Sequence, residues 1–392
     1  MANLASADES TSSSDNIVAR HAVGLINEKD AAGRRLRRFH ARNSTGRRID
    51  TMRIGVVGAG AVGGAIAAVL SRGGHDVEVT ARGAHLAAIL DRGIRLKGEW
   101  GDFTAQVDAA EILTRAPELV IVATKAQDSA AAIRDNAHLF RGIPLLIVQN
   151  GLDAMSTARA AAPRSDVVGG LATFASSFLS PGEVTITTTG HLYLGVAGPD
   201  DVPARFAARV LNVVLPTSVI PNFTGAQWTK LVINQVNALP AITGLSVQDV
   251  IADRRLRRIM TASMRETVRI GRANHIRFEK LQGLGRRGLA LFSVLPLWLG
   301  QALPALMSAR VGKTPNPGST LQSIRRGQAT EIDFLNGAVV RAALAIGRMA
   351  PINAALVALV HEVEASAEFL SPEEVVVRVM RGATRPLATV GK

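Results

Sequence analysis

Three glycines with the spacing G-x-G-x-x-G have the geometry needed to hold a phosphate. Gly58, Gly60 and Gly63 follow an apolar run and precede a stretch of small and apolar residues that reads as a helix, Ala61 to Leu70. At such a turn the first glycine permits the bend, the second admits a pyrophosphate to the backbone, and the third lets the helix pack closely. The helix N-terminus then turns free N–H groups and a positive dipole end toward the phosphates. The predicted cradle consists of Gly58, Ala59, Gly60, Ala61, Val62 and Gly63.

The next apolar segment, His75 to Arg82, indicates which dinucleotide the cradle holds. Val77 and Val79 alternate inward, so Glu78 points to the other face, and the strand ends in Ala81-Arg82. A carboxylate at this strand end holds a ribose 2′-hydroxyl, whereas a nearby arginine suits a 2′-phosphate. We therefore predict NADP(H) as cofactor and Arg82 as the residue that binds its 2′-phosphate. The alternative is an Arg82 that only caps a surface strand.

Two further strand-like runs, residues 119–124 and 144–149, each end in polar residues. Lys125 follows the first and Asn150-Gly151 follows the second. In an open parallel sheet the ligand lies outside the carboxyl ends of the strands. Lys125 and Asn150 are therefore expected at the same crevice as the glycines, although Asn-Gly is also an ordinary turn.

A stripe of one amine and two carboxamides marks the second half of the chain. Lys230, Asn234 and Asn237 stand at i, i+4 and i+7 in Gly225–Gly244, and a continuous helix would bring them to one face. Periodicity alone equally describes the solvated face of an amphipathic helix. Further on, Thr330-x-x-Asp333 reads as a capping box that puts Glu331 in the first turn of an apolar helix.

These elements imply an α/β Rossmann-type N-terminal domain followed by an all-α C-terminal domain. At 392 residues the chain is long enough for two domains. The predicted divisions are 1–51, a disordered extension; 52–222, the NADP-binding domain; and 223–392, a helical domain with an apolar insert at about 281–313.

The order of several motifs resembles the ketopantoate reductase (2-dehydropantoate 2-reductase) family. The motifs are GAGAVG, Lys125 in T-K-A, Gln149-Asn150-Gly151, W-T-K-L-V-I-N, and S-T-L-Q-S followed by T-E-I-D-F-L-N-G. The match runs collinearly from about Met52 to Glu362. The resemblance implies that residues 223–392 form a substrate and dimerisation domain like the C-terminal domain of 6-phosphogluconate dehydrogenase. It also implies NADPH-dependent reduction of ketopantoate to pantoate and a place in pantothenate biosynthesis.

The resemblance also implies roles for single residues. Lys230 matches the catalytic lysine, which protonates the carbonyl oxygen as hydride reaches the carbon. Lys125 and Asn150 match residues that face cofactor and substrate. The resemblance implies that Ser319 holds the substrate carboxylate. It implies that Glu331 lies beside the cofactor and holds either a hydroxyl group or the lysine itself. Asn234 and Asn237 complete the implied substrate-binding set, and no metal site is implied.

The chain departs from the family pattern at three places. In the family a second asparagine follows the lysine on its helix, at the position that Ala238 occupies in this chain; Asn237 lies one residue before that position. At a second place, Ser323 stands where the family commonly has a carboxylate. The third departure is Gly288–Ala309, 22 residues without a charge. Prolines and a glycine interrupt this segment, so a membrane span is disfavoured. A pair of short helices that cover the cleft, meet a second subunit or touch a membrane surface is expected instead. As a lid, it would imply a bulkier 2-oxo acid or ketone as substrate.

Composition sets the remaining expectations. The first 51 residues are polar and Arg-rich without a core pattern, which predicts disorder, and Met52 is the expected ancestral start. The net charge of +13 comes with 4% aromatic residues, so it suits small anionic ligands better than nucleic acid. The absence of cysteine suits a reducing cytoplasm. The partner is expected to be a small 2-oxo acid, with a homodimer as an open option. A non-catalytic NADP-sensing protein remains the alternative function.

Overall fold

The computed structural model describes residues 22–29, 35–42, 51–311 and 315–384 of the chain. By its internal contacts the chain divides into two compact units, Met1–Thr51 and Met52–Lys392. The first unit contains strands β1 (Ala22–Lys29) and β2 (Arg35–Arg42), which pair antiparallel. Apart from these strands and Thr51, residues 1–51 lie outside the described part, and the disordered extension stays a prediction.

The second unit begins with an eight-stranded sheet in the order β14-β13-β10-β9-β8-β3-β4-β7. All neighbouring strands in it are parallel except β10 and β13. The strands of this sheet are β3 (Arg53–Val57), β4 (Asp76–Thr80), β7 (Asp108–Ala110), β8 (Leu119–Val122), β9 (Pro144–Val148), β10 (Asp166–Ala172), β13 (Leu192–Gly195) and β14 (Thr217–Val219). Strand order reverses beside β3, which pairs with β4 on one side and β8 on the other. The carboxyl ends of β3 and β8 thus form the switch point at which such sheets bind ligands.

Apolar residues cover both faces of this sheet, as a parallel sheet requires. Leu119 and Ile121 of β8 belong to one core, with α1, α5 and a second sheet, while Val120 and Val122 belong to the other, with α3 and α4. The second sheet has the order β11-β12-β5-β6, formed by β5 (Ile94–Gly98), β6 (Phe103–Ala105), β11 (Ala175–Ser180) and β12 (Glu183–Thr188). The helices between these strands are α1 (Ala61–Arg72), α2 (Gly83–Arg92), α3 (Ala126–Asn136), α4 (Ala154–Ala161) and α5 (Val202–Leu211), with the 3-10 turn η1 (Ala137–Leu139).

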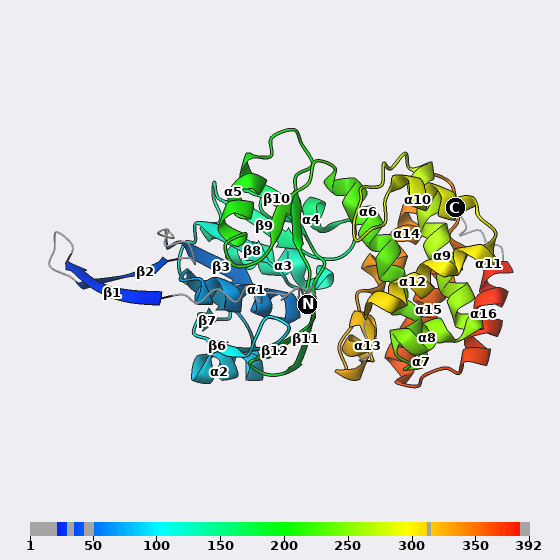
Figure 1. Ribbon diagram of the computed structural model, residues 1–392, viewed down its shortest axis with the longest axis horizontal. Coiled ribbons are helices and arrows are strands. Elements are labelled where there is room, and N and C mark those ends of the chain that lie inside the picture. The colour runs from blue at the N-terminus through cyan, green and yellow to red at the C-terminus, as the bar shows by residue number, and fades with distance from the viewer. Residues whose placement is uncertain (1–21, 30–34, 43–50, 312–314, 385–392) are drawn as a thin grey trace, which may run out of the picture. The chain divides into compact units, whose positions relative to one another are not determined.

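After β14 the described chain is helical (Figure 1). The elements are α6 (Phe223–Asn234), η2 (Gln235–Asn237), α7 (Ala238–Thr243), α8 (Val247–Ala252), α9 (Arg254–Ala273), α10 (Arg286–Val294), α11 (Leu297–Gly300), α12 (Ala302–Val311), α13 (Gly318–Arg325), η3 (Ile332–Phe334), α14 (Asn336–Leu344), α15 (Pro351–Ser366) and α16 (Pro372–Thr384). The predicted fold class, a Rossmann-type α/β part followed by an all-helical part, is confirmed.

The central helix of this second part is α9, which packs on α6, α8, α10, α14, α15 and α16. Asp253 caps its start by accepting hydrogen bonds from the N–H groups of Arg255 (2.7 Å) and Leu256 (3.1 Å). Leu256, Met260 and Met264 recur on its buried face at a spacing of four residues. One apolar stripe therefore holds several helices around a single core.

Two local expectations are wrong. The helix of Lys230 does not continue to Asn237, because α6 ends at Asn234 and a 3-10 turn follows. Pro240 lacks the N–H that a continuous helix would require there. The capping box also fails. Glu331 precedes a 3-10 turn, α14 starts only at Asn336, and the Asp333 carboxylate instead lies 3.1 Å from the His361 ring.

The uncharged segment forms three short helices, α10 to α12, where a pair was expected. They pack on α8 and α9, and Leu289, Phe292 and Gly300 are buried there. No helix in the described residues is long and apolar enough to cross a membrane. Because its contacts are with α8 and α9, the segment is an outer layer of the helical core. The lid, with the bulkier substrate inferred from it, stays a prediction.

Candidate active site

The glycine turn has the shape that a dinucleotide phosphate requires. A Cβ on Gly58, at φ +96°, would lie 2.9 Å from the Thr124 nitrogen, and one on Gly63 would lie 2.0 Å from the Gly58 oxygen. These two glycines therefore allow backbone segments to approach one another. A Cβ on Gly60, which is the N-cap of α1, would meet no atom within 4 Å. Gly60 thus leaves open space at a helix N-terminus, and the turn fits a bound pyrophosphate.

Two side chains that follow the turn in sequence hold it in place. Thr80, at the end of β4, accepts a hydrogen bond from Gly58 N–H through its hydroxyl and one from Ala59 N–H through its carbonyl, both at 2.9 Å. The His85 ring on α2 lies with Nε2 2.7 Å from the Ala59 oxygen and accepts from Gly182 N–H at Nδ1 (3.0 Å). Burial lowers the His85 pKa, so the neutral ring with its proton on Nε2 satisfies both bonds. Sequence reasoning missed His85, since its partners come from distant segments.

The residues at the end of β4 differ in exposure. Ala81 is buried and Arg82 is exposed, as the N-cap of α2. Glu78 is buried away from the turn and accepts from the Thr114 hydroxyl (2.6 Å) and N–H (2.8 Å). An arginine beside the glycine turn, with Glu78 bonded elsewhere, is compatible with a ligand that carries an additional phosphate.

Lys125 lies just past β8, where it bonds to residues from much later in the chain. Its ammonium donates to the Ala329 carbonyl (2.7 Å) and the Ser323 hydroxyl (3.2 Å). Burial is the main cause of its lowered pKa; Glu331 acts in the opposite direction, and the Arg326 cation lowers it further. Gln149 ties the ends of β8 and β9 together by donating to the Thr124 carbonyl (2.8 Å).

Asn150, Asn234 and Glu331, predicted from three separate motifs, lie in one chain of hydrogen bonds. Asn234 donates to the Asn150 side-chain oxygen at 3.4 Å, and Asn150 hydrogen-bonds the Glu331 carboxylate. Glu331 also accepts from Ala126 N–H at 3.2 Å. Burial raises the Glu331 pKa, while these hydrogen bonds and the cations of Lys125 and Lys230 oppose the rise.

Lys230 lies one helical turn before Asn234 on α6 and is half-buried. Its ammonium donates to the carbonyl of Ala172, the last residue of β10. Withdrawal from water lowers the Lys230 pKa to about 8, and the Glu331 carboxylate partly offsets this. A lysine with this pKa at the carboxyl edge of the sheet can hold a proton at neutral pH and release it readily.

Asn237 and Ser319 meet where η2 contacts the start of α13. The Asn237 side chain accepts from Ser319 N–H (3.3 Å) and donates to the Asn234 carbonyl (3.1 Å). A Cβ on Gly318 would lie 2.7 Å from the Asn237 oxygen, so the two elements are in close contact. Asn237 thus joins η2 to α13, whereas Ser319 is exposed in the first turn of that helix. Their roles toward a substrate stay predictions.

Arg326 is a second residue that the sequence did not single out. Its guanidinium donates to the Phe178 carbonyl and lies over the Phe178 ring, 5.9 Å from its centroid. That ring packs edge-on against His85, with centroids 4.4 Å apart. The Arg326 Nε is buried without a hydrogen-bond partner, and burial lowers the pKa of the guanidinium. Arg326 therefore brings an unsatisfied cation close to the residues that hold the glycine turn.

The described residues contain no group of three or more His, Asp or Glu side chains that could hold a metal ion. The chemistry at this edge of the sheet is that of two lysines, one carboxylate and carboxamides beside a phosphate cradle. Such a set can orient an anionic carbonyl compound and donate a proton to its oxygen.

Comparison with known proteins gives two family-model matches. The model described as ketopantoate reductase PanE/ApbA matches residues 54–199, and its C-terminal counterpart matches residues 222–364. The 2-dehydropantoate 2-reductase of Pyrococcus abyssi is 26% identical over 318 residues, which is 80% of this chain and 98% of that protein. The enzyme of the same name from Pyrococcus horikoshii is 27% identical over 79% of this chain and 96% of its own length.

Solved structures agree with the fold. A PanE/ApbA family ketopantoate reductase from Ralstonia eutropha superposes with a TM-score of 0.68 at 28% identity, covering 80% of this chain and 99% of that one. A D-mandelate dehydrogenase in complex with NADH and anilino(oxo)acetate gives a TM-score of 0.70 at 20% identity, with 80% and 99% covered. The second similarity shows the fold alone.

Proposed function

Because the chain belongs to the ketopantoate reductase family, we propose that it reduces a 2-oxo acid with NADPH, and that 2-dehydropantoate is its substrate. The observation that carries the proposal is the position of Lys230. Its ammonium bonds to the end of β10, its pKa is lowered to about 8, and it interacts with Glu331. Asn150 hydrogen-bonds that carboxylate, and Asn234 hydrogen-bonds Asn150.

A reduced nicotinamide, when bound, supplies a hydride to the carbonyl carbon of the substrate. Lys230 holds the proton that the carbonyl oxygen needs as negative charge develops there, and it donates that proton along a preorganised direction. Glu331 stabilises the protonated form of Lys230 by its charge. Asn150 and Asn234 keep the Glu331 carboxylate and the substrate oxygen atoms in fixed positions. Ser319, exposed at the start of α13, binds the substrate carboxylate.

We propose NADPH rather than NADH on the residues at the end of β4. Arg82 is exposed beside the glycine turn, and the carboxylate of Glu78 is bonded elsewhere. Lys125 and Arg326 add positive charge for the diphosphate or the substrate. The D-mandelate dehydrogenase of similar fold binds NADH, so cofactor choice has to be measured for this chain.

A substrate screen tests the function. The purified protein is mixed with NADPH and ketopantoate, or with a series of 2-oxo acids with larger side chains, and loss of the reduced-nicotinamide absorbance is followed. We expect the fastest oxidation with ketopantoate. Faster oxidation with a larger acid would reassign the substrate within the same chemistry. Binding of NADPH without oxidation by any carbonyl compound would contradict the proposal and identify a non-catalytic NADP-binding protein.

A further inference from the structure

Positive charge is concentrated in the α9–α12 region of the helical part. Residues 254–307 contain eleven lysines or arginines and two acidic residues, a net charge of +9 in a chain whose total is +13. Few of these charges are neutralised internally. Of the eleven, only Arg255 forms an ion pair with a carboxylate in the described part of the chain. An unpaired cluster of this size produces a positive potential that attracts anionic surfaces.

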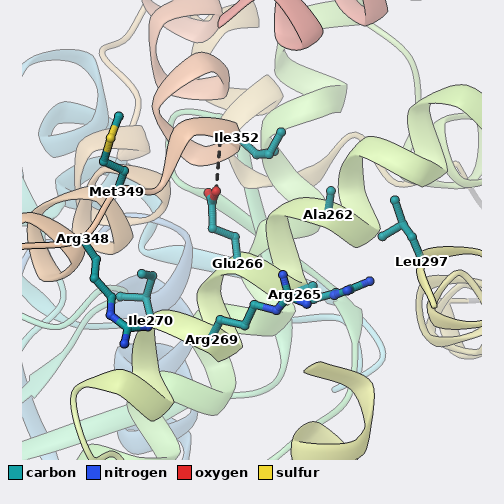
Figure 2. Close-up of a pocket in the computed structure, with 9 residues that line it drawn as sticks. All are labelled: Ala262, Arg265, Glu266, Arg269, Ile270, Leu297, Arg348, Met349 and Ile352. Carbon is teal, nitrogen blue, oxygen red and sulfur yellow. Dashed lines mark hydrogen bonds between the residues drawn. The ribbon is translucent and has the colours of Figure 1, made fainter. Parts of the chain in front are cut away.

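Two open hollows on this region are lined by arginines. The first, about 760 Å³, is lined by Arg265 and Arg269 of α9, Arg348, Leu297 and Met349 among others (Figure 2). The second, about 420 Å³, is lined by three arginines, His275 and Ala290 among others. The arginines of the second hollow are Arg272, Arg277 and Arg286. Both hollows therefore offer guanidinium groups to anionic ligands.

The one carboxylate at these hollows does not neutralise the arginines. Glu266 accepts hydrogen bonds from Asn353 N–H (2.8 Å), the Asn353 side chain (2.6 Å) and Ile352 N–H (3.2 Å). In Figure 2 its carboxylate points toward Ile352, while Arg265 and Arg269 extend away from it. The Arg265 Nε is buried and has no hydrogen-bond partner in the described residues. The first hollow is thus a cationic pocket without a counter-charge at hydrogen-bonding distance.

An exposed apolar ridge lies on α10 and α11, which also line the hollows: Leu297 of α11 lines the first, and Arg286 and Ala290 of α10 line the second. Arg269 donates to the Ser293 carbonyl (3.0 Å), and Arg272 donates to the Ser293 hydroxyl (2.7 Å). These two bonds fix the end of α10 to α9. The apolar residues on α10 and α11 are unusually exposed: Leu291 57%, Val294 66%, Trp298 70% and Leu299 40%. Exposed apolar residues that lie together on a protein surface mark an interaction site.

We propose that this face, formed by the two arginine-lined hollows and the ridge of Leu291, Val294, Trp298 and Leu299, docks the protein onto an anionic lipid surface. Lipid phosphates match the guanidinium groups, and the boundary between headgroups and acyl chains matches the leucines, the valine and the tryptophan. A second copy of the chain fits less well, because the two arginine clusters would repel each other. Nucleic acid would leave the ridge uncovered. None of these residues belongs to the group around Lys230, so the inference is independent of the proposed reductase activity.

Vesicle co-sedimentation tests the proposal with the full chain. Vesicles of phosphatidylcholine alone are compared with vesicles containing about one third phosphatidylglycerol, which gives the surface its negative potential. We expect binding only to the anionic vesicles, together with a blue shift of tryptophan emission. Trp298 should give this shift, because it is 70% exposed, while Trp228 is 4% exposed and the half-buried Trp100 packs against Phe174. Equal binding to both kinds of vesicle, or to neither, would overturn the proposal.

Two pairs of substitutions separate the charged and apolar contributions. Arg286→Gln with Arg348→Gln removes one exposed arginine from each hollow and should weaken binding at least tenfold, since each arginine near such a surface contributes roughly fivefold. Leu291→Ser with Trp298→Ser should weaken binding similarly and abolish the blue shift. Matched controls are Arg159→Gln with Arg209→Gln, and Leu90→Ser, which change exposed residues on other helices. Controls and variants should oxidise NADPH at the unchanged rate.

Other occupants of the face predict different results. In one outcome, free glycerol phosphate abolishes binding to the vesicles, while the protein with Leu291→Ser and Trp298→Ser binds them as tightly as the parent chain does. In that case the ligand is a soluble phosphate and the lipid proposal is wrong. If light scattering reports a dimer that Trp298→Ser converts to a monomer, a second copy covers the ridge and the proposal is again wrong. Weakening by the face variants but not by their controls supports it.

Discussion

Lys230 and Glu331 bring opposite charges into a place withdrawn from water, and each influences the protonation of the other. Burial lowers the Lys230 pKa to about 8 and raises that of Glu331. The negative charge of Glu331 limits the fall of the Lys230 pKa, and the positive charge of Lys230 limits the rise of the Glu331 pKa. In the proposed reaction Lys230 must carry its proton, so the rate of reduction should fall as pH rises through about 8.

Glu331→Gln tests this coupling at the level of one charge. Glutamine keeps the shape and loses the charge, so protonated Lys230 loses a favourable partner and its pKa falls further. The alkaline decline of kcat/KM should therefore move to lower pH by roughly one unit. The measurement is the pH profile of NADPH oxidation, with the exposed Glu111→Gln as control. A decline that stays in place, or moves to higher pH, would show that Glu331 does not act on the lysine by charge.

Arg82→Ala tests the choice of cofactor. Loss of a charge-assisted bond to a 2′-phosphate should weaken NADPH binding by roughly tenfold or more and leave NADH binding nearly unchanged. Dissociation constants for both nucleotides can be measured by the fluorescence of the reduced nicotinamide. The control is Arg209→Ala, an exposed arginine on α5. Equal losses for the two nucleotides would show that Arg82 does not distinguish them.

At the residue scale, the strand-end and motif rules found the polar residues that meet at the sheet edge. They could not find His85 or Arg326. His85 is fixed by Ala59 and Gly182, and Arg326 by Phe178, so both depend on contacts between segments far apart in sequence. No periodicity in the sequence marks such contacts. The substrate roles of Asn237 and Ser319 remain predictions, since the Asn237 side chain is bonded between η2 and α13.

Helix α1 and the turn before it form the element on which cofactor binding depends, and their glycines serve two different purposes. Gly63 lies against the Gly58 carbonyl, where any side chain would collide with backbone. Gly60 faces open space at the helix start. One position is needed for packing, and the other is needed for the ligand.

Gly63→Ala and Gly60→Ala should therefore have different effects. Gly63→Ala places a methyl group 2.0 Å from a backbone oxygen, so it should lower the free energy of unfolding by about 1–3 kcal/mol. Gly60→Ala should leave stability nearly unchanged and weaken NADPH binding, because its methyl group occupies the space of the phosphate. Urea unfolding and nicotinamide fluorescence measure the two effects. Equal destabilisation by both substitutions, or unchanged binding in Gly60→Ala, would contradict the assignment.

Elements with strong local patterns were predicted closely, and those governed by tertiary packing were not. The helix predicted to begin at Ala61 begins there, and the runs predicted at residues 119–124 and 144–149 form β8 and β9. The break after Asn234 was missed because an amphipathic stripe in the sequence continues through Pro240. The uncharged insert was predicted to form two helices. Its division into three, α10, α11 and α12, follows from packing against α8 and α9 and not from a pattern in the sequence.

For the whole molecule, two properties stand out: division into two units and an uneven distribution of charge. Residues Met1–Thr51 and Met52–Lys392 form separate compact units. Of the overall net charge of +13, residues 254–307 alone account for +9. Sequence counts could have located this cluster; its meeting with the exposed ridge required the structure.

Removal of residues 1–51 tests the first property. The fragment Met52–Lys392 contains all three apolar cores, so it should unfold cooperatively within about 2 °C of the full chain's Tm. Its rate of NADPH oxidation should also be unchanged. Calorimetry and the activity assay measure both. A large fall in Tm would show that the first unit stabilises the second.

The central claim is that Lys230 donates the proton during reduction by NADPH. The most direct test compares Lys230→Ala with the exposed control Lys280→Ala, measuring the NADPH dissociation constant and the single-turnover rate of its oxidation by ketopantoate. We predict unchanged NADPH affinity in both variants and, in Lys230→Ala alone, a rate lower by roughly a hundredfold or more. A Lys230→Ala protein that oxidises NADPH at a rate close to that of the parent chain would contradict the claim.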